Sequence, residues 1–361
     1  EGIRQTQGIA IPSFVPSDAA RLGNLADGSR VKVDPAITKY LALYPHANGP
    51  VAGDKGLYTL ASARIVAENY YTVRGDHRIS EKDNVYATYV YDKAPYNQPD
   101  TFNNQNILSS TIRHIAALEE SHIFSPNLVN NVRGGFNRNA IVNFLGVSAI
   151  NPAVADPSLG VMPGANNPNT VIAGGFTALG VGLFGNNTLH HWNSFQFYDD
   201  ASLTRGSHSL KFGFAVERMH YNFFSTFMRF GKLRFNSLKD FLVNNPSSLE
   251  GGFPEAIRPR GLRETIFGGY IQDDWRVRRG LTLNIGLRYE MATVPNEVYG
   301  QLTSLAAFSD PLPLCGTGDP ALTTVLGKPG CAGVSSFFNN PSKGNFEPRF
   351  GFAWDPRGDG K

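Results

Sequence analysis

The chain alternates apolar and polar residues over short segments, and the clearest case surrounds a tight turn. Between Leu281 and Tyr289 every second residue is large and apolar, whereas the intervening residues are Thr, Asn, Gly and Arg. A period of two predicts a β-strand and not a helix. The same alternation precedes an Arg-Arg-Gly connection, so residues 267–291 are predicted to form a hairpin. A soluble antiparallel sheet would show the same pattern, and one hairpin does not separate a sandwich from a barrel.

The same unit recurs along the chain with long polar segments between the copies. Hairpins are predicted at residues 70–91, 111–139, 192–221 and 267–291, with a further strand at 346–354. Residues 1–67 are predicted to be mostly loop, with a short helix at 35–43. The connections between hairpins are far longer than the turns within them, which is uncommon in compact soluble domains. Short turns at one end, long loops at the other and strands of roughly 10 residues are typical of outer-membrane barrels.

Composition is compatible with that class and argues against two others. The 361 residues include 38 Gly, 14 Tyr and 25 Phe, only 17% are charged, and the formal net charge is +3. The mean hydropathy of −0.23 is no objection, because barrel strands show only every second residue to lipid. No apolar run approaches the ~18 residues of a spanning helix, which excludes an α-helical membrane protein. No dense Lys/Arg cluster is present, so nucleic acid is not an expected partner.

The chain lacks the local signatures of catalysis. We find no G-x-S-x-G, no Walker A loop, no H-E-x-x-H and no G-x-G-x-x-G after a strand, so we expect neither an enzyme nor a cofactor. His190 and His191 are adjacent, but neighbours in a strand point to opposite faces, and we expect no metal there. The same alternation predicts a polar ladder inside the barrel. Its members are Gln272, Asp274, Arg276 and Arg288. Asp273 falls on the apolar face, and we expect either that it lies near a membrane boundary or that a β-bulge re-aims its side chain.

Several segments together carry a family resemblance. They include VRGDHRISEKDNVYATYVY (residues 73–91), FSPNLVNNVRGGFNR (124–138), GSHSLKFGFAVER (206–218), YIQDDWRVRRGLTLNIGLRYE (270–290) and NFEPRFGFAWDPRGDGK (345–361). With IPSFVPSDAARLGNL (11–25) and DPAITKYLALYPHAN (34–48), they span most of the chain in the family's order. The chain resembles the barrel portion of an Oar-like TonB-dependent receptor. Each segment alone is weakly diagnostic, because alternating strands resemble one another, whereas the ordered set is specific.

The resemblance implies an all-β, antiparallel transmembrane barrel of the bacterial outer membrane, with 22 strands around a plug. Twenty-two strands of about 10 residues would need on the order of 220 residues before any loop. The long loops leave room for about half of that number, and we find no signal peptide, plug sequence or TonB box. We therefore expect residues 1–361 to be a single partial barrel domain, about half of a large barrel.

The implied function is energy-coupled uptake of a scarce or large ligand, such as a siderophore or an oligosaccharide. Outer-membrane lipid and the TonB complex, reached through a plug outside this chain, are the implied partners. The alternative is a surface, adhesion or structural barrel without transport. Ligand contacts are expected in the long loops and the upper lumen, from Phe223, Phe224, Phe227, Arg229, Arg258, Arg260 and Arg263. These residues would otherwise belong to an aromatic girdle and to a lipopolysaccharide-facing rim.

Two cysteines lie in one long loop. Cys315 and Cys331 are 16 positions apart, between several prolines and glycines. In an oxidising compartment they would form a disulfide and constrain the loop, which is worth roughly 3 kcal/mol in the chain-entropy model. The spacing alone also fits free thiols, but the placement of this loop on the outer surface favours the disulfide.

Overall fold

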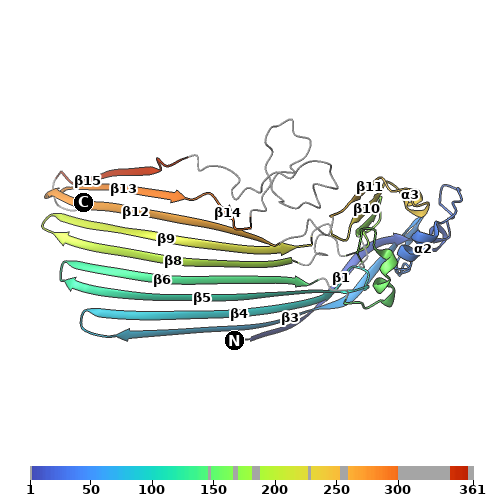
Figure 1. The fold of residues 1–361 in the computed structure, drawn as a ribbon, viewed down its shortest axis with the longest axis horizontal. Helices are drawn as coiled ribbons and strands as arrows, with labels where there is room; N and C mark the ends of the chain where they lie inside the picture. The colour runs from blue at the N-terminus through green and yellow to red at the C-terminus, as the bar shows by residue number, and fades with distance from the viewer. Residues whose placement is uncertain are drawn as a thin grey trace.

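One large antiparallel sheet dominates the computed structural model. The structure describes residues 2–144, 148–165, 170–180, 188–226, 229–252, 259–299 and 342–356. The sheet has twelve strands, and its main path runs β1-β3-β4-β5-β6-β8-β9-β12-β13-β15. The strands lie side by side as long ribbons whose axes are closely aligned, and neighbouring strands run in opposite directions (Figure 1). Among the described strands, β1 and β15 are the two edges.

Most strands are longer than the sequence predicts, whereas the strand at residues 346–354 has its predicted bounds. The principal ones are β1 (Gly2–Pro16), β3 (Lys55–Arg78), β4 (Asp83–Pro99), β5 (Asn106–Ser125), β6 (Leu128–Phe144), β8 (Thr188–Arg205), β9 (His208–Ser225), β12 (Arg260–Arg278), β13 (Leu281–Ala292) and β15 (Phe346–Trp354). Two short strands, β2 (Val51–Ala52) and β14 (Asn296–Glu297), pair with β3 and β12. An antiparallel pair occupies each predicted hairpin and extends beyond its predicted limits, because backbone hydrogen bonds continue where the side-chain alternation weakens.

The prediction that residues 1–67 are mostly loop is wrong. β1 pairs with β3 over its whole length, from Gly2 opposite Asn69 to Pro16 opposite Lys55. The apolar and polar positions of β1 contrast weakly, and prolines interrupt it at positions 12 and 16. Proline is tolerated because β1 is an edge strand, where one row of N–H groups has no neighbour to bond. The predicted helix at 35–43 is present as α2 (Pro35–Leu41), which begins at the N-cap Asp34.

The four hairpin turns lie together at one end of the sheet (Figure 1). Between β12 and β13 the chain reverses at Arg279 and Gly280, and Gly280 has a φ of 78°. Its amide carbonyl accepts a hydrogen bond of 2.7 Å from the N–H of Asp355. A side chain at position 280 would collide with the Asp355 carbonyl, so this turn requires glycine for its conformation and for its space.

Four segments far apart in sequence fold together at the opposite end of the sheet, and we call this unit the cap (Figure 1). The cap comprises residues 17–54, 100–105, 148–180 and 229–250, within the described ranges. It contains α1 (Asp18–Arg21), α2, the 3-10 turns η1 (Pro152–Ala155) and η2 (Pro157–Leu159), and α3 (Leu238–Leu242). It also contains a small sheet in the order β11 (Ser248–Glu250), β10 (Lys232–Phe235), β7 (Thr170–Ala173).

The hydrophobic core of the described residues lies in the cap and not under the large sheet. Its fully buried members include Ile37, Leu159, Val171, Phe241 and Leu242. Side chains from all four segments meet there, so the segments predicted as separate long loops form one packed unit. No helix of the described chain is long and apolar enough to cross a membrane.

Candidate functional site

The two faces of the large sheet have different chemistry. One face, which we call the apolar face, carries Phe212, Ile271 and Leu287 in one cross-strand row. On the other, which we call the polar face, charged and hydroxyl groups are bonded to one another along the sheet. Because neighbouring residues alternate between faces, the pairing register assigns each strand residue to one of the two.

The polar face carries a network that crosses four strands, from β3 to β6. Arg74 donates two hydrogen bonds to Asp76, of 2.9 and 2.8 Å, and its guanidinium lies 4.3 Å from the centre of the Tyr86 ring. Tyr86 donates to Glu119, which also accepts from Arg133 Nε, both at 2.8 Å. These charges neutralise one another in a layer that contains few apolar side chains. The polar face is therefore suited to contact water or another polar surface.

The second half of the polar face surrounds a cavity of about 350 Å³. Tyr198, Asp200, Glu217, Tyr270, Arg288 and Glu290 contribute polar groups to its lining. Tyr270 donates a hydrogen bond of 2.8 Å to Asp200, and Arg288 bonds to Glu290. The cavity is thus bounded by carboxylates that already have donors.

The predicted polar ladder occupies this region. Alternation places Gln272, Asp274 and Arg276 on the same face as Tyr270, and Gln272 lies 3.5 Å from Asp274. Arg288 stands opposite Tyr270 in the register. Arg276 is exposed, two residues before the end of β12, where its amide donates to the carbonyl of Ser207. It lies beside the turns, whereas the other three residues belong to the wall of the sheet.

Nearer the cap, aromatic rings are stacked on the polar face. His190 and Trp192 on β8 lie beside Tyr221 and Phe223 on β9, and we call these four residues the aromatic cluster. The rings of Tyr221 and Phe223 stack with centres 5.4 Å apart, and those of His190 and Tyr221 with centres 5.9 Å apart. His190 Nδ1 also lies 2.6 Å from the Tyr221 hydroxyl. Such a surface can stack against a planar or sugar-like ligand.

Arginines and amides border the aromatic cluster. Arg260 is opposite Phe223 in the register, and Asn139 is opposite Trp192. The Asn139 side-chain oxygen is buried and has no hydrogen-bond partner in the described structure. Arg113 is opposite Asn139 on the other side and lies 3.7 Å from Asp92. The cluster therefore combines ring faces with a guanidinium group and an unsatisfied acceptor.

The structure disperses the predicted ligand-contact residues. Their placement in long loops is wrong for four of them, which lie in strands. Phe223 and Phe224 are in β9, and Arg260 and Arg263 are in β12, because both strands continue beyond the predicted limits. Alternation sends Phe223 and Arg260 to the polar face and Phe224 and Arg263 to the apolar face.

The other loop predictions have different outcomes. Arg229 lies in a turn after β9, where its amide donates 2.8 Å to the carbonyl of Thr226. Phe227, Arg258, Cys315 and Cys331 are outside the described residues, and the disulfide stays a prediction.

Sequence reasoning missed the aromatic cluster as a unit. Its signal is present, because His190 and Trp192 are two positions apart, as are Tyr221 and Phe223. Reading it requires the register between β8 and β9, which places His190 opposite Phe223 and His191 opposite Asn222. The two histidines thus lie on opposite faces of β8.

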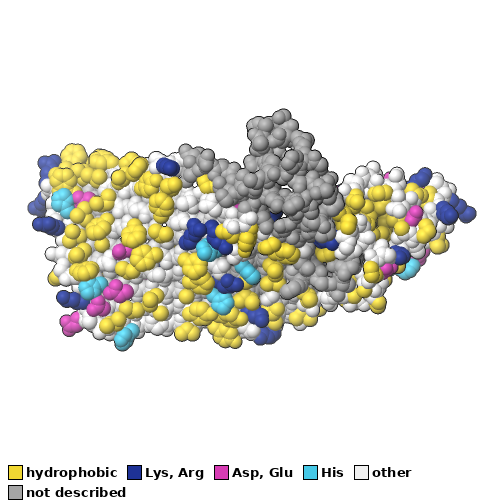
Figure 2. All heavy atoms as spheres, in the orientation of Figure 1, with side chains coloured by type: hydrophobic (Ala, Val, Ile, Leu, Met, Phe, Trp, Pro, Cys, Tyr) yellow, Lys and Arg dark blue, Asp and Glu magenta, His cyan; other side chains and the backbone are white. Residues whose placement is uncertain are grey.

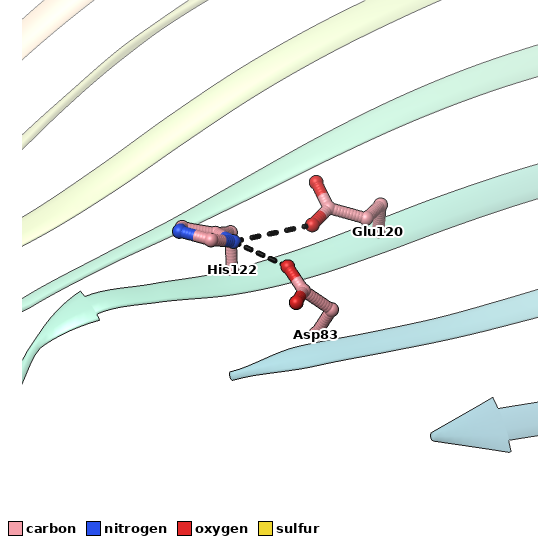
Figure 3. A group of neighbouring side chains, drawn as sticks. All are labelled: Asp83, Glu120 and His122. Carbon is pink, nitrogen blue, oxygen red and sulfur yellow. Dashed lines mark hydrogen bonds and ion pairs between the residues drawn. The ribbon is translucent and has the colours of Figure 1, made fainter. Parts of the chain in front are cut away.

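One trio of residues could hold a cation. Ligand atoms of Asp83, Glu120 and His122 lie within 4.8 Å of one another (Figure 3). His122 on β5 points to Asp83 at the start of β4 and is hydrogen-bonded to it, while Glu120 Oε1 lies 3.8 Å from the imidazole. The trio is on the apolar face beside the turns. There, mutual pairing of an imidazole with two carboxylates reduces the cost of placing charge near a hydrophobic surface.

Asp273, the carboxylate that falls on the apolar face, is also paired with a histidine. Its Oδ2 lies 2.6 Å from Nδ1 of His208, the first residue of β9, and the His208 ring stacks on Trp275 with centres 5.2 Å apart. The carboxylate that falls on the apolar face thus sits close to the turns, beside a titratable partner.

The comparison that decides the class is with protein families. The model for the outer membrane beta barrel domain matches residues 1–361. The chain belongs to this family. It is therefore a protein of the bacterial outer membrane, its apolar face contacts lipid, and its polar face lines the lumen. The short turns face the periplasm and the cap lies on the extracellular side.

Solved outer-membrane proteins are similar to this chain at low identity. FpvA of P. aeruginosa, bound to a heterologous pyoverdine and iron, has 14% identity and a TM-score of 0.38, over 65% of this chain and 31% of that protein. The outer membrane transporter YddB from Escherichia coli has 10% identity and a TM-score of 0.37, over 82% of this chain and 34% of that protein. The copper transporter OprC has 9% identity and a TM-score of 0.35, over 97% of this chain and 41% of that protein. The chain thus spans about a third of the length of these proteins. No curated protein sequence matches it.

Proposed function

We propose that this outer membrane beta barrel domain is the barrel part of a TonB-dependent receptor that takes up a scarce or large ligand. The observation that carries the proposal is the aromatic cluster with Arg260, on the lumenal side of the wall near the cap. Stacked rings beside a guanidinium suit a ligand that combines flat or sugar-like surfaces with carboxylates, which Arg binds in bidentate fashion. The resemblance of the ordered strand segments to Oar-like receptors supports the same function.

The polar face below the cluster supports a second part of the proposal. A lumen lined with the Arg74, Glu119 and Arg133 network suits a hydrated partner, such as a plug domain, and not a lipid. In a TonB-dependent receptor the plug would occupy the lumen and would carry the coupling to the TonB complex. The barrel then binds and passes the ligand without chemical conversion.

The cap supports a competing function. Four segments with a common hydrophobic core present a packed unit at the cell surface, which is also what a surface-binding or adhesion protein needs. In that case the extracellular face of the cap would bind a partner and no ligand would enter the lumen.

Uptake in the host bacterium separates these functions. The full-length protein would be expressed in strains with and without TonB, and accumulation of labelled ferric siderophore, cobalamin and an oligosaccharide would be measured. We expect accumulation of one probe that is lost without TonB and lost on collapse of the proton gradient. Accumulation that is indifferent to TonB, or a binding phenotype with no accumulation of any probe, would favour the surface role.

A further inference from the structure

Basic side chains and imidazoles form a row across the apolar face. The register aligns His114 on β5, Arg138 on β6, Asn193 on β8, His220 on β9 and Arg263 on β12 as successive neighbours. Arg218 lies on the same face, two residues from His220. In Figure 2 the Lys, Arg and His side chains gather in a band midway along the strands, beyond a zone of hydrophobic side chains. We call Arg138, Arg218, Arg263 and the two histidines the basic row.

The height of the basic row matches a membrane boundary. Arg138 comes ten residues after Leu128, the first residue of β6, and Arg218 comes ten residues after His208, the first residue of β9. Ten residues at about 3.4 Å each, tilted by about 40°, rise about 26 Å from the periplasmic turns. That rise is close to the height of the apolar band of an outer-membrane barrel. The basic row therefore stands at the headgroups of the outer leaflet.

The three guanidinium groups are held by neutral acceptors. Arg138 donates 2.8 Å to the Asn193 side chain, Arg218 donates 2.7 Å to the Thr265 hydroxyl, and Arg263 donates 2.8 Å to the carbonyl of Leu262. No ion pair to an acid is formed by these arginines within the part of the chain that the structure describes. The acidic strand residues described on this face are Asp83, Glu120, Asp199 and Asp273. All four lie nearer the periplasmic turns, so the positive charge of the row is not neutralised locally.

An apolar groove of about 940 Å³ adjoins the basic row on the membrane side. Small residues, Gly75, Ala87, Ala116 and Gly134, form its floor on four neighbouring strands, and Arg218 is among its lining residues. A Cβ atom added at Gly75 or Gly134 would meet nothing within 4 Å, so the space over both glycines is open. A groove of this kind can accept an acyl chain whose headgroup lies at the arginines.

We propose that this wall binds a phosphorylated glycolipid of the outer leaflet, with its phosphates on the basic row and an acyl chain in the groove. Arg138 and Arg263 are separated by three strand intervals, about 14 Å at roughly 4.8 Å per interval. That separation suits a disaccharide headgroup with a phosphate at each end better than a phospholipid with one phosphate. Guanidinium groups bind phosphate oxygens in bidentate fashion. The inference requires only the membrane orientation of the domain and is independent of ligand uptake.

The test is native mass spectrometry of the full-length protein, purified from outer membranes in mild detergent. The probes are diphosphoryl lipid A, its dephosphorylated form, phosphatidylglycerol and inorganic phosphate. We expect wild type to retain diphosphoryl lipid A, and the triple variant R138Q/R218Q/R263Q to bind it at least tenfold more weakly. The matched control R276Q/R278Q/R279Q removes three positive charges at the periplasmic turns and should bind as wild type does.

A second variant keeps the test decisive if the triple variant folds poorly. Gly134→Leu fills the groove without disturbing an arginine, and we expect it to weaken binding of diphosphoryl lipid A several-fold while heat-modifiable migration on gels stays normal. Unchanged affinity in both variants would overturn the proposal. So would equal retention of the dephosphorylated form or of phosphatidylglycerol, displacement by millimolar inorganic phosphate, or a second protein chain occupying this wall.

Discussion

Tyr270 on β12 donates a 2.8 Å hydrogen bond to Asp200 on β8, and the bond passes over the intervening strand β9 at Gly213. A side chain at position 213 would collide with Asp200 and would press on the Tyr270 ring. The glycine therefore permits two strands that are not neighbours to be joined through their side chains. The bond holds three consecutive strands of the lumenal wall in one arrangement.

Gly213→Ala is accordingly expected to break the Tyr270–Asp200 bond and to lower stability by about 1–3 kcal/mol, since a partly buried donor and acceptor lose each other. The measurement is thermal unfolding of the full-length protein in detergent. Gly75→Ala is the matched control, because a methyl group there meets open space. Equal melting temperatures for the two variants would show that the bond contributes nothing.

Phe223 and Phe224 are adjacent in sequence but lie on opposite faces of β9, which makes them a natural pair for testing the lumenal site. Phe223→Ala removes a ring that stacks on Tyr221, and we expect the affinity for the probe identified in the uptake experiment to fall up to about tenfold, in keeping with ~0.5–1.5 kcal/mol for an aromatic contact. Phe224→Ala should leave affinity within twofold. The measurement is equilibrium binding of the labelled probe to whole cells, and a larger effect at position 224 would contradict the assignment of the lumenal face.

We expect the stability of the cap core to be independent of the stability of the strands. Phe241 is fully buried and packs against Phe235 and Tyr44, with ring centres 5.2 and 6.4 Å away. Phe241→Ala is expected to destabilise the cap by about 3–5 kcal/mol through lost burial and a residual cavity. Hydrogen exchange followed by mass spectrometry should show faster exchange in cap peptides and unchanged exchange in β5 and β6. Val243→Ala, at a position 40% exposed, is the control and should leave cap exchange unaltered.

Asp100 should make the cap less stable as pH rises. Burial raises the pKa of this carboxyl, although its Oδ1 accepts amide hydrogen bonds from Asn104 and Phe102 at 2.7 and 3.3 Å. A raised folded-state pKa means that the folded cap binds the proton more tightly than the unfolded chain does. The stabilising contribution of the protonated Asp100 carboxyl to the cap is thus complete below the unfolded-state pKa of about 3.9. It is lost as pH rises through the raised folded-state pKa.

The substitution Asp100→Asn keeps an oxygen for both amides without the charge. We expect it to stabilise the cap at pH 7 and to leave it unchanged at pH 3, as read from hydrogen exchange in cap peptides. Asp156 has the opposite effect on how cap stability changes with pH. Hydrogen bonds from Ser158 and the nearby Lys39 hold the pKa of Asp156 low, so Asp156→Asn should destabilise the cap at pH 7 and have no effect at low pH. The same pH response in both variants would contradict the burial argument.

The sequence by itself determined the hairpin strands and their faces, because in these segments a period of two is a local property that each segment carries alone. Leu281 to Tyr289 shows it directly, and the same alternation correctly separates His190 from His191 and Asp273 from Asp274. Turn chemistry, as at Gly280, is equally local, since φ and the space for a side chain depend on a few neighbouring atoms. The weak contrast of β1 left no such signal, and its strand forms because β3 supplies a full ladder of partners.

Only the tertiary structure decided which residues stand together. Phe223 reaches His190 and Arg260 through the registers of β8 and β12, and Arg138 reaches Asn193 and the basic row in the same way. The cap joins Ile37 to Leu159 and Phe241, which lie more than a hundred residues later in the sequence. The segments of Leu159 and Phe241 alone read as polar loops, and the helix predicted around Ile37 does not indicate what it packs against. Registers and loop packing are set by contacts between distant segments. The free energy of these contacts is gained only when both segments are present, so a local sequence pattern does not predict it.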